Sequence, residues 1–279
     1  MDLWVFQDFS MSEILIPSLS LSGLGAFFSI ILILANRFLK VEEDERIKII
    51  ENILPGANCG ACGYPGCSQY AEAIVKEGAP TNLCAPGGEE VAKAISEILG
   101  RKEEVKERKV CVLLCQGGKG VAIDKYEYKG IKDCRVAVLI QGGPKKCPYG
   151  CIGLGTCEEA CPFDAIKIGD NGLPVIDEDK CTGCGICVRV CPRNVLKLIS
   201  RNQKIYLACN SHDSGKEVRE YCKKGCFTCK ICVNPKFVPG EKIILKDDLP
   251  EIQVDKIDNY EEIRIVLDKC PANCYVERK

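Results

Sequence analysis

The chain of 279 residues contains only one histidine, one tryptophan and two methionines. A single histidine excludes zinc sites of the Cys₂His₂ kind, haem held by two histidines, and acid–base chemistry that depends on histidine pairs. The 38 basic and 39 acidic side chains nearly balance, which excludes a generally nucleic-acid-seeking protein. The phosphate-binding motifs G-x-x-x-x-G-K-[ST] and strand-to-helix G-x-G-x-x-G are also missing, so we expect no nucleotide site on this chain.

Cysteine, in contrast, is abundant, with 22 in the chain. In a short secreted chain such a density would indicate a disulfide scaffold. The length and the 46% of hydrophobic residues instead allow two or more domains with cores of their own. The predicted fold class is α+β, with chemistry that depends on thiolates.

The segment 14–36 has no charged residue. As a helix it would be about 34 Å long, enough to cross the hydrocarbon core of a bilayer. A cleaved signal peptide, which would need a basic start, and a buried soluble helix are the alternatives. Arg37 and Lys40 follow the segment, which predicts a single-pass anchor in the cytoplasmic membrane with the soluble part on the cytoplasmic side. In that reducing compartment, clustered cysteines indicate metal or redox sites.

Composition and motifs divide the chain into five expected segments. They are a membrane anchor at 1–36, a small helical 4Fe-4S domain at 37–100, a strand-containing connecting segment at 101–146, a bacterial-type two-cluster ferredoxin domain at 147–204, and a degenerate ferredoxin-like domain with one cluster at 205–279. Apolar spacing predicts helices near 41–54, 68–77 and 89–99. Short runs rich in valine and isoleucine predict strands at 110–114 and 136–140. The charged stretch 101–109 is the expected linker.

The second half of the chain contains a partial repeat. The stretch KKCPYGCIGLGTC aligns with REYCKKGCFTCKIC, and this alignment matches Cys147 with Cys222, Cys151 with Cys226, and Cys157 with Cys232. Upstream, VLLCQGGKG and YLACNSHDSGK each place one cysteine in a strand-like segment, Cys115 in one copy and Cys209 in the other. Duplicated ferredoxin modules would produce this pattern.

The most specific motif is CTGCGICVRVCP at 181–192, with the spacing C-x₂-C-x₂-C-x₃-C-P. Three thiolates on one tight loop can hold three corners of an iron–sulfur cubane, and the fourth cysteine of each such motif ligates the other cluster of the pair. The motif CIGLGTCEEACP at 151–162 fits the same template except at Leu154. This crossover predicts one [4Fe–4S] cluster on Cys161, Cys181, Cys184 and Cys187.

The partner cluster then has Cys151, Cys157 and Cys191 and lacks a fourth ligand. Cys147 lies four residues upstream of Cys151 and is the predicted replacement. A three-iron cluster and a different thiolate are the alternatives.

The C-terminal region contains two incomplete cysteine motifs. GCFTCKICVNPK supplies three cysteines, but Lys236 stands where the fourth is expected, and Cys270-Pro271 has no three-cysteine loop before it. These losses are complementary under the crossover rule. They predict a single cluster on Cys226, Cys229, Cys232 and Cys270.

The first soluble domain has three cysteines in a glycine-punctuated loop and one after a helix: Cys59, Cys62, Cys67 and Cys84. By count, four thiolates suit a [4Fe–4S] cluster or a Cys₄ zinc site, and the long gap and the other motifs favour iron. Four [4Fe–4S] clusters are therefore expected in all.

Six cysteines are left over: Cys111, Cys115, Cys134, Cys209, Cys222 and Cys274. Small buried thiols are the plain explanation for some of them. Because the repeat places Cys115 and Cys209 alike, an extra site pooled from Cys115, Cys134, Cys209 and Cys222 is an alternative.

Three features are shared with a known family: the anchor, the C-G-x-C-G-x-x-G-C loop with its distant Cys-x-Pro-Gly-Gly, and the segments GLGTCEEACPFDAI and GLPVIDEDKCTGCGICVRVCPRNVLKLI. In these features the chain resembles the long form of the B subunit of the Rnf complex. The resemblance covers essentially the whole chain. It implies the electron-transfer subunit of a membrane-bound ferredoxin:NAD⁺ oxidoreductase that is coupled to Na⁺ or H⁺ translocation. Such a subunit takes electrons from reduced ferredoxin and passes them to the other Rnf membrane subunits, which hold the flavins and the NAD site. This sequence departs from the fuller long form at Lys236 and in the missing final three-cysteine loop.

Reduced ferredoxin is acidic in most organisms, so the implied partner should dock on a basic surface. The stretch 212–236 flanks the tail cluster and has six basic residues against three acidic ones: Lys216, Arg219, Lys223, Lys224, Lys230 and Lys236. We expect electrons to enter there, and to leave through the cluster on the first soluble domain, which is nearest the anchor in sequence.

Two other function classes remain open on sequence alone. A shorter relative of the Rnf complex is associated with keeping a redox-sensing transcription factor reduced. The cysteines could alternatively brace small folds around structural zinc.

Overall fold

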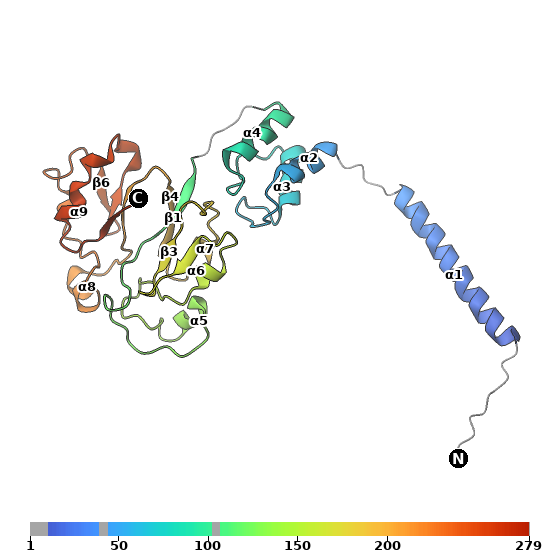
Figure 1. Cartoon of the computed structure of the whole chain (residues 1–279), viewed down its shortest axis with the longest axis horizontal. Helices are drawn as coiled ribbons and strands as arrows, with labels where there is room; N and C mark the ends of the chain where they lie inside the picture. Colours follow the sequence, from blue (N-terminus) through green and yellow to red (C-terminus); the bar gives the residue numbers. More distant parts are fainter. Residues whose placement is uncertain (1–10, 39–43, 102–106, 279) are drawn as a thin grey trace, which may run out of the picture. The chain divides into compact units, whose positions relative to one another are not determined.

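The computed structural model describes residues 11–38, 44–101 and 107–278. These residues form helices and short strands, as expected for the α+β class (Figure 1). The described residues up to Glu45 belong to one compact unit, and those from Arg46 onward belong to a second. Three features expected from sequence lie at least partly outside the described residues: Lys40, the start of the helix at 41–54, and most of the charged linker at 101–109.

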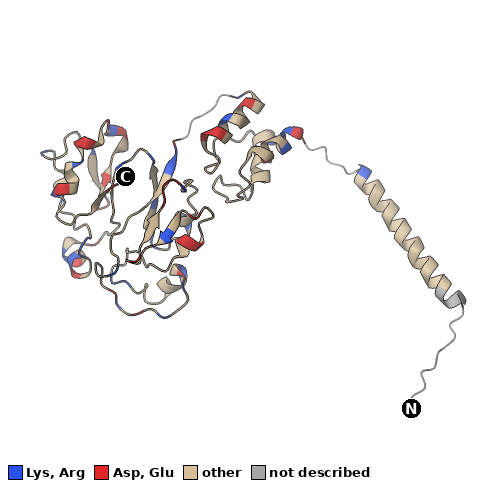
Figure 2. Ribbon diagram, viewed as in Figure 1, with Lys and Arg blue, Asp and Glu red and all other residues tan. Residues whose placement is uncertain are grey.

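Helix α1, Met11–Phe38, contains the uncharged segment. Its span Leu15–Phe38 has a mean hydropathy of 2.1, and none of it is buried, so it is not a core helix of the described chain. Pro17 lies inside the helix, and the hydroxyls of Ser18 and Ser20 donate hydrogen bonds back to main-chain carbonyls. A basic residue, Arg37, lies in the last turn of the helix (Figure 2). α1 thus has the length and apolar surface of a membrane-spanning helix.

Three helices form the small helical region: α2, Glu45–Ile53; α3, Cys67–Lys76; and α4, Gly88–Leu99. They confirm the helices expected there to within a few residues. Ile50, Ile74 and Ile95, one from each helix, are fully buried together. Gly100 ends α4 with a φ of 61°, a left-handed conformation that glycine adopts without strain. This core fixes the cysteine loop that joins α2 to α3.

The first ferredoxin-like repeat consists of two antiparallel strand pairs and two short helices. β1, Lys109–Leu113, pairs with β4, Leu196–Ser200, and β2, Ile166–Ile168, pairs with β3, Pro174–Ile176. Helices α6, Thr156–Glu159, and α7, Ile186–Val190, each lie within a cysteine motif. β1 comes from the connecting segment, so that segment contributes a strand to the sheet of the ferredoxin region.

The second repeat has the same strand pattern. An outer pair, β5, Ile205–Leu207, with β8, Tyr275–Glu277, encloses the hairpin of β6, Ile243–Lys246, and β7, Leu249–Ile252. The 3₁₀ turn η1, Ile231–Val233, and the helix α9, Ile265–Lys269, accompany its cysteines as α6 and α7 do in the first repeat. The remaining elements are α8, Gly215–Tyr221, η2, Val254–Lys256, and η3, Tyr260–Glu262.

The strand expected at 136–140 is wrong, because this run lies in helix α5, Cys134–Leu139, and the residue after it. Asp133 caps the helix, and its carboxylate accepts a hydrogen bond of 2.7 Å from the main-chain N–H of Arg135. Side-chain capping satisfies main-chain donors at a helix start and so favours a helix over an unpaired strand. The apolar run suggested a buried strand, but its last two residues, Leu139 and Ile140, are exposed and do not pack in a sheet.

Arg278 joins the end of the second repeat to the first. Its guanidinium binds the Glu178 carboxylate through two nitrogens, with Nε–Oε1 at 2.7 Å, and donates to the carbonyls of Ser200, Arg201 and Gln203. The Arg278 side chain is only 6% exposed. Removing the arginine leaves the half-buried Glu178 carboxylate and three carbonyls without their donor, which costs roughly 1–3 kcal/mol.

We therefore expect Arg278→Ala to lose its clusters at least tenfold faster in guanidinium chloride, as measured by the decay of visible absorbance. Arg264→Ala is the matched control: that arginine also has two carboxylate partners, Glu261 and Glu277, but its side chain is 50% exposed. Exposed pairs contribute little to stability, so the control should decay at nearly the unsubstituted rate. Equal rates for the two variants would contradict the joining role of Arg278.

Candidate iron-sulfur centres

Cysteine thiols gather around four pockets in the described chain, each with about 320–480 Å³ of empty space. Within the described residues, no three or more His, Cys, Asp or Glu side chains are arranged to hold a single metal ion. In a cubane each thiolate binds a different iron, so its ligands surround a volume instead of converging on one point. Each pocket brings together cysteines from different segments of the chain.

The helical-domain pocket is lined by all four of its predicted ligands: Cys59, Cys62, Cys67 and Cys84. Asn58 shapes the loop, because its side-chain oxygen accepts a hydrogen bond of 2.8 Å from the main-chain N–H of Cys67. Tyr70 holds the incoming chain: its hydroxyl donates to the Pro80 carbonyl at 2.7 Å and accepts from the Leu83 N–H at 3.1 Å. These bonds position Cys84 opposite the loop.

Cys161, Cys181 and Cys187 belong to the core of the first repeat, where Cys181 and Cys187 are buried; Cys184, the remaining predicted ligand, is half-buried. The leftover Cys111 lies beside them on β1. Its main-chain N–H donates to the Cys181 sulfur at 3.4 Å, and its sulfur is 3.4 Å from that of Cys187. Cys111 thus supports this group from the neighbouring strand.

The first-repeat pocket is lined by Cys151, Cys157 and Cys191, the three predicted ligands, together with Cys134. Cys134 is the first residue of α5, and its N–H donates to the Thr156 hydroxyl at 2.7 Å. Thr156 precedes Cys157, so this bond ties the start of α5 to the cysteine loop. Cys134 therefore occupies the place for which the sequence suggested Cys147.

Cys147 lies in a different pocket, which we call the junction pocket. Its thiols come from both repeats: Cys115, Cys147, Cys209 and Cys222. The extra site suggested by the sequence contained three of these four residues, with Cys134 in the place of Cys147. Cys134 lines the first-repeat pocket, and Cys147 lines the junction pocket.

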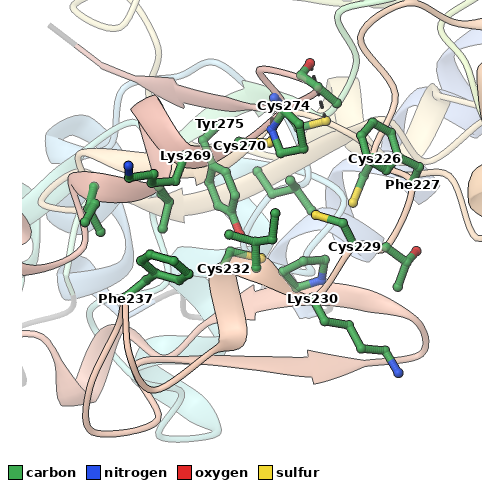
Figure 3. Close-up of a pocket in the computed structure, with 18 residues that line it drawn as sticks. Cys226, Phe227, Cys229, Lys230, Cys232, Phe237, Lys269, Cys270, Cys274 and Tyr275 are labelled. Atoms are coloured by element: carbon green, nitrogen blue, oxygen red, sulfur yellow. Dashed lines mark hydrogen bonds between the residues drawn. The ribbon is translucent and has the colours of Figure 1, made fainter.

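The tail pocket is lined by its four predicted ligands, Cys226, Cys229, Cys232 and Cys270, and by the leftover Cys274. Figure 3 shows the five cysteines near Tyr275, with the amine of Lys230 pointing away from them. Cys274 is fully buried, and its main-chain N–H donates to the Cys270 sulfur at 3.4 Å. Cys229 is exposed, so this pocket reaches the protein surface.

Burial disfavours the charged form of several of these thiols. It raises the pKa of Cys84 and Cys147 to about 11, and that of Cys157 and Cys209 to about 12. A buried thiolate is therefore unfavourable on its own and needs a compensating positive charge. Iron would supply that charge when it replaces the protons.

Two family models match the chain in the regions of these pockets. An Fe-S cluster family model matches residues 54–86, which include the helical-domain cysteines. A model for a 4Fe-4S dicluster domain matches residues 148–198, which include the two motifs of the first repeat. The helical and first-repeat regions are thus iron–sulfur regions.

Curated relatives extend the similarity to most of the chain. The B subunit of an ion-translocating oxidoreductase complex from Methanosarcina acetivorans is 42% identical over 88% of this chain and 93% of its own length. The chain belongs to this B-subunit family. Another member, from Acetobacterium woodii, is named for an Na⁺-translocating ferredoxin:NAD⁺ oxidoreductase complex and is 40% identical over 95% of this chain and 78% of its own. A third, from Clostridium ljungdahlii, is named for a proton-translocating complex and is 42% identical over 77% of this chain and 76% of its own. Membership in the B-subunit family agrees with the resemblance that the motifs indicated.

Proposed function

We propose that this chain is the electron-transfer subunit of a membrane-bound ferredoxin:NAD⁺ oxidoreductase that translocates Na⁺ or H⁺. The chain accepts electrons from reduced ferredoxin and relays them to membrane subunits of the complex. The observation that supports this role best is the gathering of cysteines around separate pockets in a chain of the B-subunit family. NAD⁺ reduction belongs to other subunits of the complex.

The cysteines supply thiolate ligands for four [4Fe–4S] clusters. The proposed sets are Cys59, Cys62, Cys67 and Cys84; Cys134, Cys151, Cys157 and Cys191; Cys161, Cys181, Cys184 and Cys187; and Cys226, Cys229, Cys232 and Cys270. A bound [4Fe–4S] cluster supplies one-electron redox chemistry. The protein sets its potential through burial and through N–H donors to sulfur, such as those of Cys111 and Cys274.

Ferredoxin docks beside the tail pocket in this proposal. Lys216, Lys230 and Lys236 are exposed around the pocket and its flanking helix α8, and the exposed Cys229 brings the pocket to the surface. Basic side chains attract an acidic carrier and raise its rate of association. The helical-domain pocket, which is nearest α1 in sequence, is the proposed exit to the membrane subunits.

Helix α1 anchors the chain, and the soluble part lies on the cytoplasmic side in this proposal. Arg37 in the last turn of α1 supports this orientation through the positive-inside bias. Ferredoxin and NAD⁺ are both on that side of the membrane, which the relay requires.

The proposed function predicts that membranes from cells lacking this chain cannot reduce NAD⁺ with reduced ferredoxin, and that the full-length chain restores the activity. The measurement is anaerobic NADH formation with ferredoxin as the only donor. Activity that persists without the chain would contradict the proposal and leave the reduction of a transcription factor as the function to test.

A further inference from the structure

The junction pocket is built from equivalent residues of the two repeats. Cys115 follows β1 by two residues and Cys209 follows β5 by two residues. Cys147 and Cys222 each precede the first cysteine of a ligand loop by four residues, in the two copies of C-x-x-G-C. Each repeat thus contributes the same pair of thiols to one pocket.

The hydrogen bonds to these thiols repeat as well. The Cys115 sulfur accepts from the N–H groups of Cys151, at 3.4 Å, and Gly117, at 3.3 Å. The Cys209 sulfur accepts from Cys226 at 3.2 Å and from Ser211. Main-chain donors to cysteine sulfur stabilise the thiolate and tune the potential of bound clusters. One cysteine sulfur from each repeat therefore accepts hydrogen bonds from two main-chain N–H groups.

The other two thiols, Cys147 and Cys222, each lie beside a glycine of a ligand loop. A Cβ atom on Gly150 would lie 3.5 Å from the Cys147 sulfur, and one on Gly225 would lie 3.6 Å from the Cys222 sulfur. A Cβ atom on Gly117 would lie 3.5 Å from the Cys115 sulfur and 3.8 Å from the Cys222 sulfur. Gly117 thus brings together a thiol from each repeat without a side chain between them.

Main-chain bonds between the repeats close the pocket. The N–H of Ile123 donates to the Tyr221 carbonyl at 2.9 Å, and the N–H of Lys223 donates to the Val121 carbonyl at 3.1 Å. The side chains of Cys147, Val218 and Tyr221 line the pocket and are buried together. The pocket is therefore a formed part of the fold, at the boundary of the two repeats.

The junction pocket is lined by four thiols, as are the helical-domain and first-repeat pockets, and the tail pocket is lined by five. Lys145 also lines the junction pocket, with a side chain only 10% exposed, and binds Asp124 at 2.9 Å. A cation beside the thiols favours their charged form.

We propose that Cys115, Cys147, Cys209 and Cys222 hold a fifth [4Fe–4S] cluster that connects the two ferredoxin-like repeats. Its neighbours follow from the hydrogen bonds: Cys151 and Cys226, which donate to Cys115 and Cys209, line the first-repeat and tail pockets. This inference rests on the proposed electron-transfer function and adds the site through which electrons cross from the tail repeat to the first repeat.

Iron, zinc and acid-labile sulfide per full-length chain, prepared without oxygen, test the fifth site. Five clusters predict about 20 iron atoms and 20 sulfides and no zinc. Alanine in place of Cys147 or Cys222 leaves three thiolates at the junction, so each change should remove one to four irons per chain and leave the redox signals of the flanking clusters in place. Thr81→Ala and Ser96→Ala are the controls, because these buried hydroxyls bond each other at 2.9 Å and line none of the cysteine pockets, and both should keep the full content.

About 16 iron atoms in the unsubstituted chain, with no loss in Cys222→Ala, would overturn the fifth site while leaving the proposed function intact. About 16 iron atoms and one zinc would also overturn it, by making the junction a structural site. Loss of iron in Cys147→Ala but not in Cys134→Ala would overturn it by returning Cys147 to the first-repeat site. Absence of iron and sulfide altogether would instead contradict the proposed function.

Discussion

Replacing Cys134 with alanine is expected to destroy the first-repeat cluster and to stop electron flow through the chain. Leu154 stands where a ferredoxin motif has its second cysteine, and Cys134 lines the same pocket as the three predicted ligands, so we propose it as the fourth. With three thiolates left, the site should lose one to four irons per chain. Ferredoxin-dependent NAD⁺ reduction in the assembled complex should fall more than about 100-fold. Changing a residue that only supports a metal site already costs about 10- to 100-fold, and Cys134 is proposed as a direct ligand.

Val112→Ala is the matched control for this experiment. Val112 is a buried residue of the same repeat, on β1, and lines none of the cysteine pockets. Iron content and activity should therefore remain near those of the unsubstituted complex. Full iron and full activity in Cys134→Ala would show that another residue completes the site.

Charge reversal at the proposed docking surface has the second largest expected effect. Changing Lys216, Lys230 and Lys236 together to glutamate replaces three exposed positive charges around the tail pocket with negative ones. At low salt, kcat/KM for ferredoxin should fall about 10- to 100-fold, because steering by opposite charge is replaced with repulsion. The difference should shrink as salt is added, since the Debye length falls to about 3 Å at 1 M.

A control with the same change in net charge separates local docking from a general effect. Lys119, Lys132 and Lys204 are exposed and lie outside 212–236, and their change to glutamate should alter kcat/KM much less. Iron content should be unchanged in both triple variants. An equal loss for the two sets, or a loss that salt does not relieve, would contradict docking at the tail pocket.

The sequence predicted well those features that depend on residues close together in the chain, such as helices and cysteine spacing. An uncharged run gave helix α1, and the three helices of the first soluble domain followed from apolar spacing and from Gly100. The repeat alignment paired Cys115 with Cys209 and Cys147 with Cys222, and the strand pattern of the two repeats is the same. The predicted ligands of the helical and tail clusters line common pockets, whereas those on the most specific motif, Cys161, Cys181, Cys184 and Cys187, line none of the four cysteine pockets described above.

Cys134 could not be placed by spacing alone. It lies 17 residues before Cys151, and its position depends on α5 and on the hydrogen bond to Thr156. Nearness in sequence favoured Cys147, but the long connection between β1 and the first-repeat loop carries that residue toward α8 instead. The one available signal was Asp133, a preferred helix cap directly before a cysteine, which the apolar run after it obscured.

The most direct test of the central claim is to mix the anaerobic full-length chain with reduced ferredoxin, without other subunits, and to follow the visible absorbance of its clusters. An electron-transfer subunit should be reduced by ferredoxin alone, so its absorbance should bleach rapidly, and faster at low salt than at high salt. A chain that contains its iron and sulfide but is not bleached by reduced ferredoxin would contradict the account.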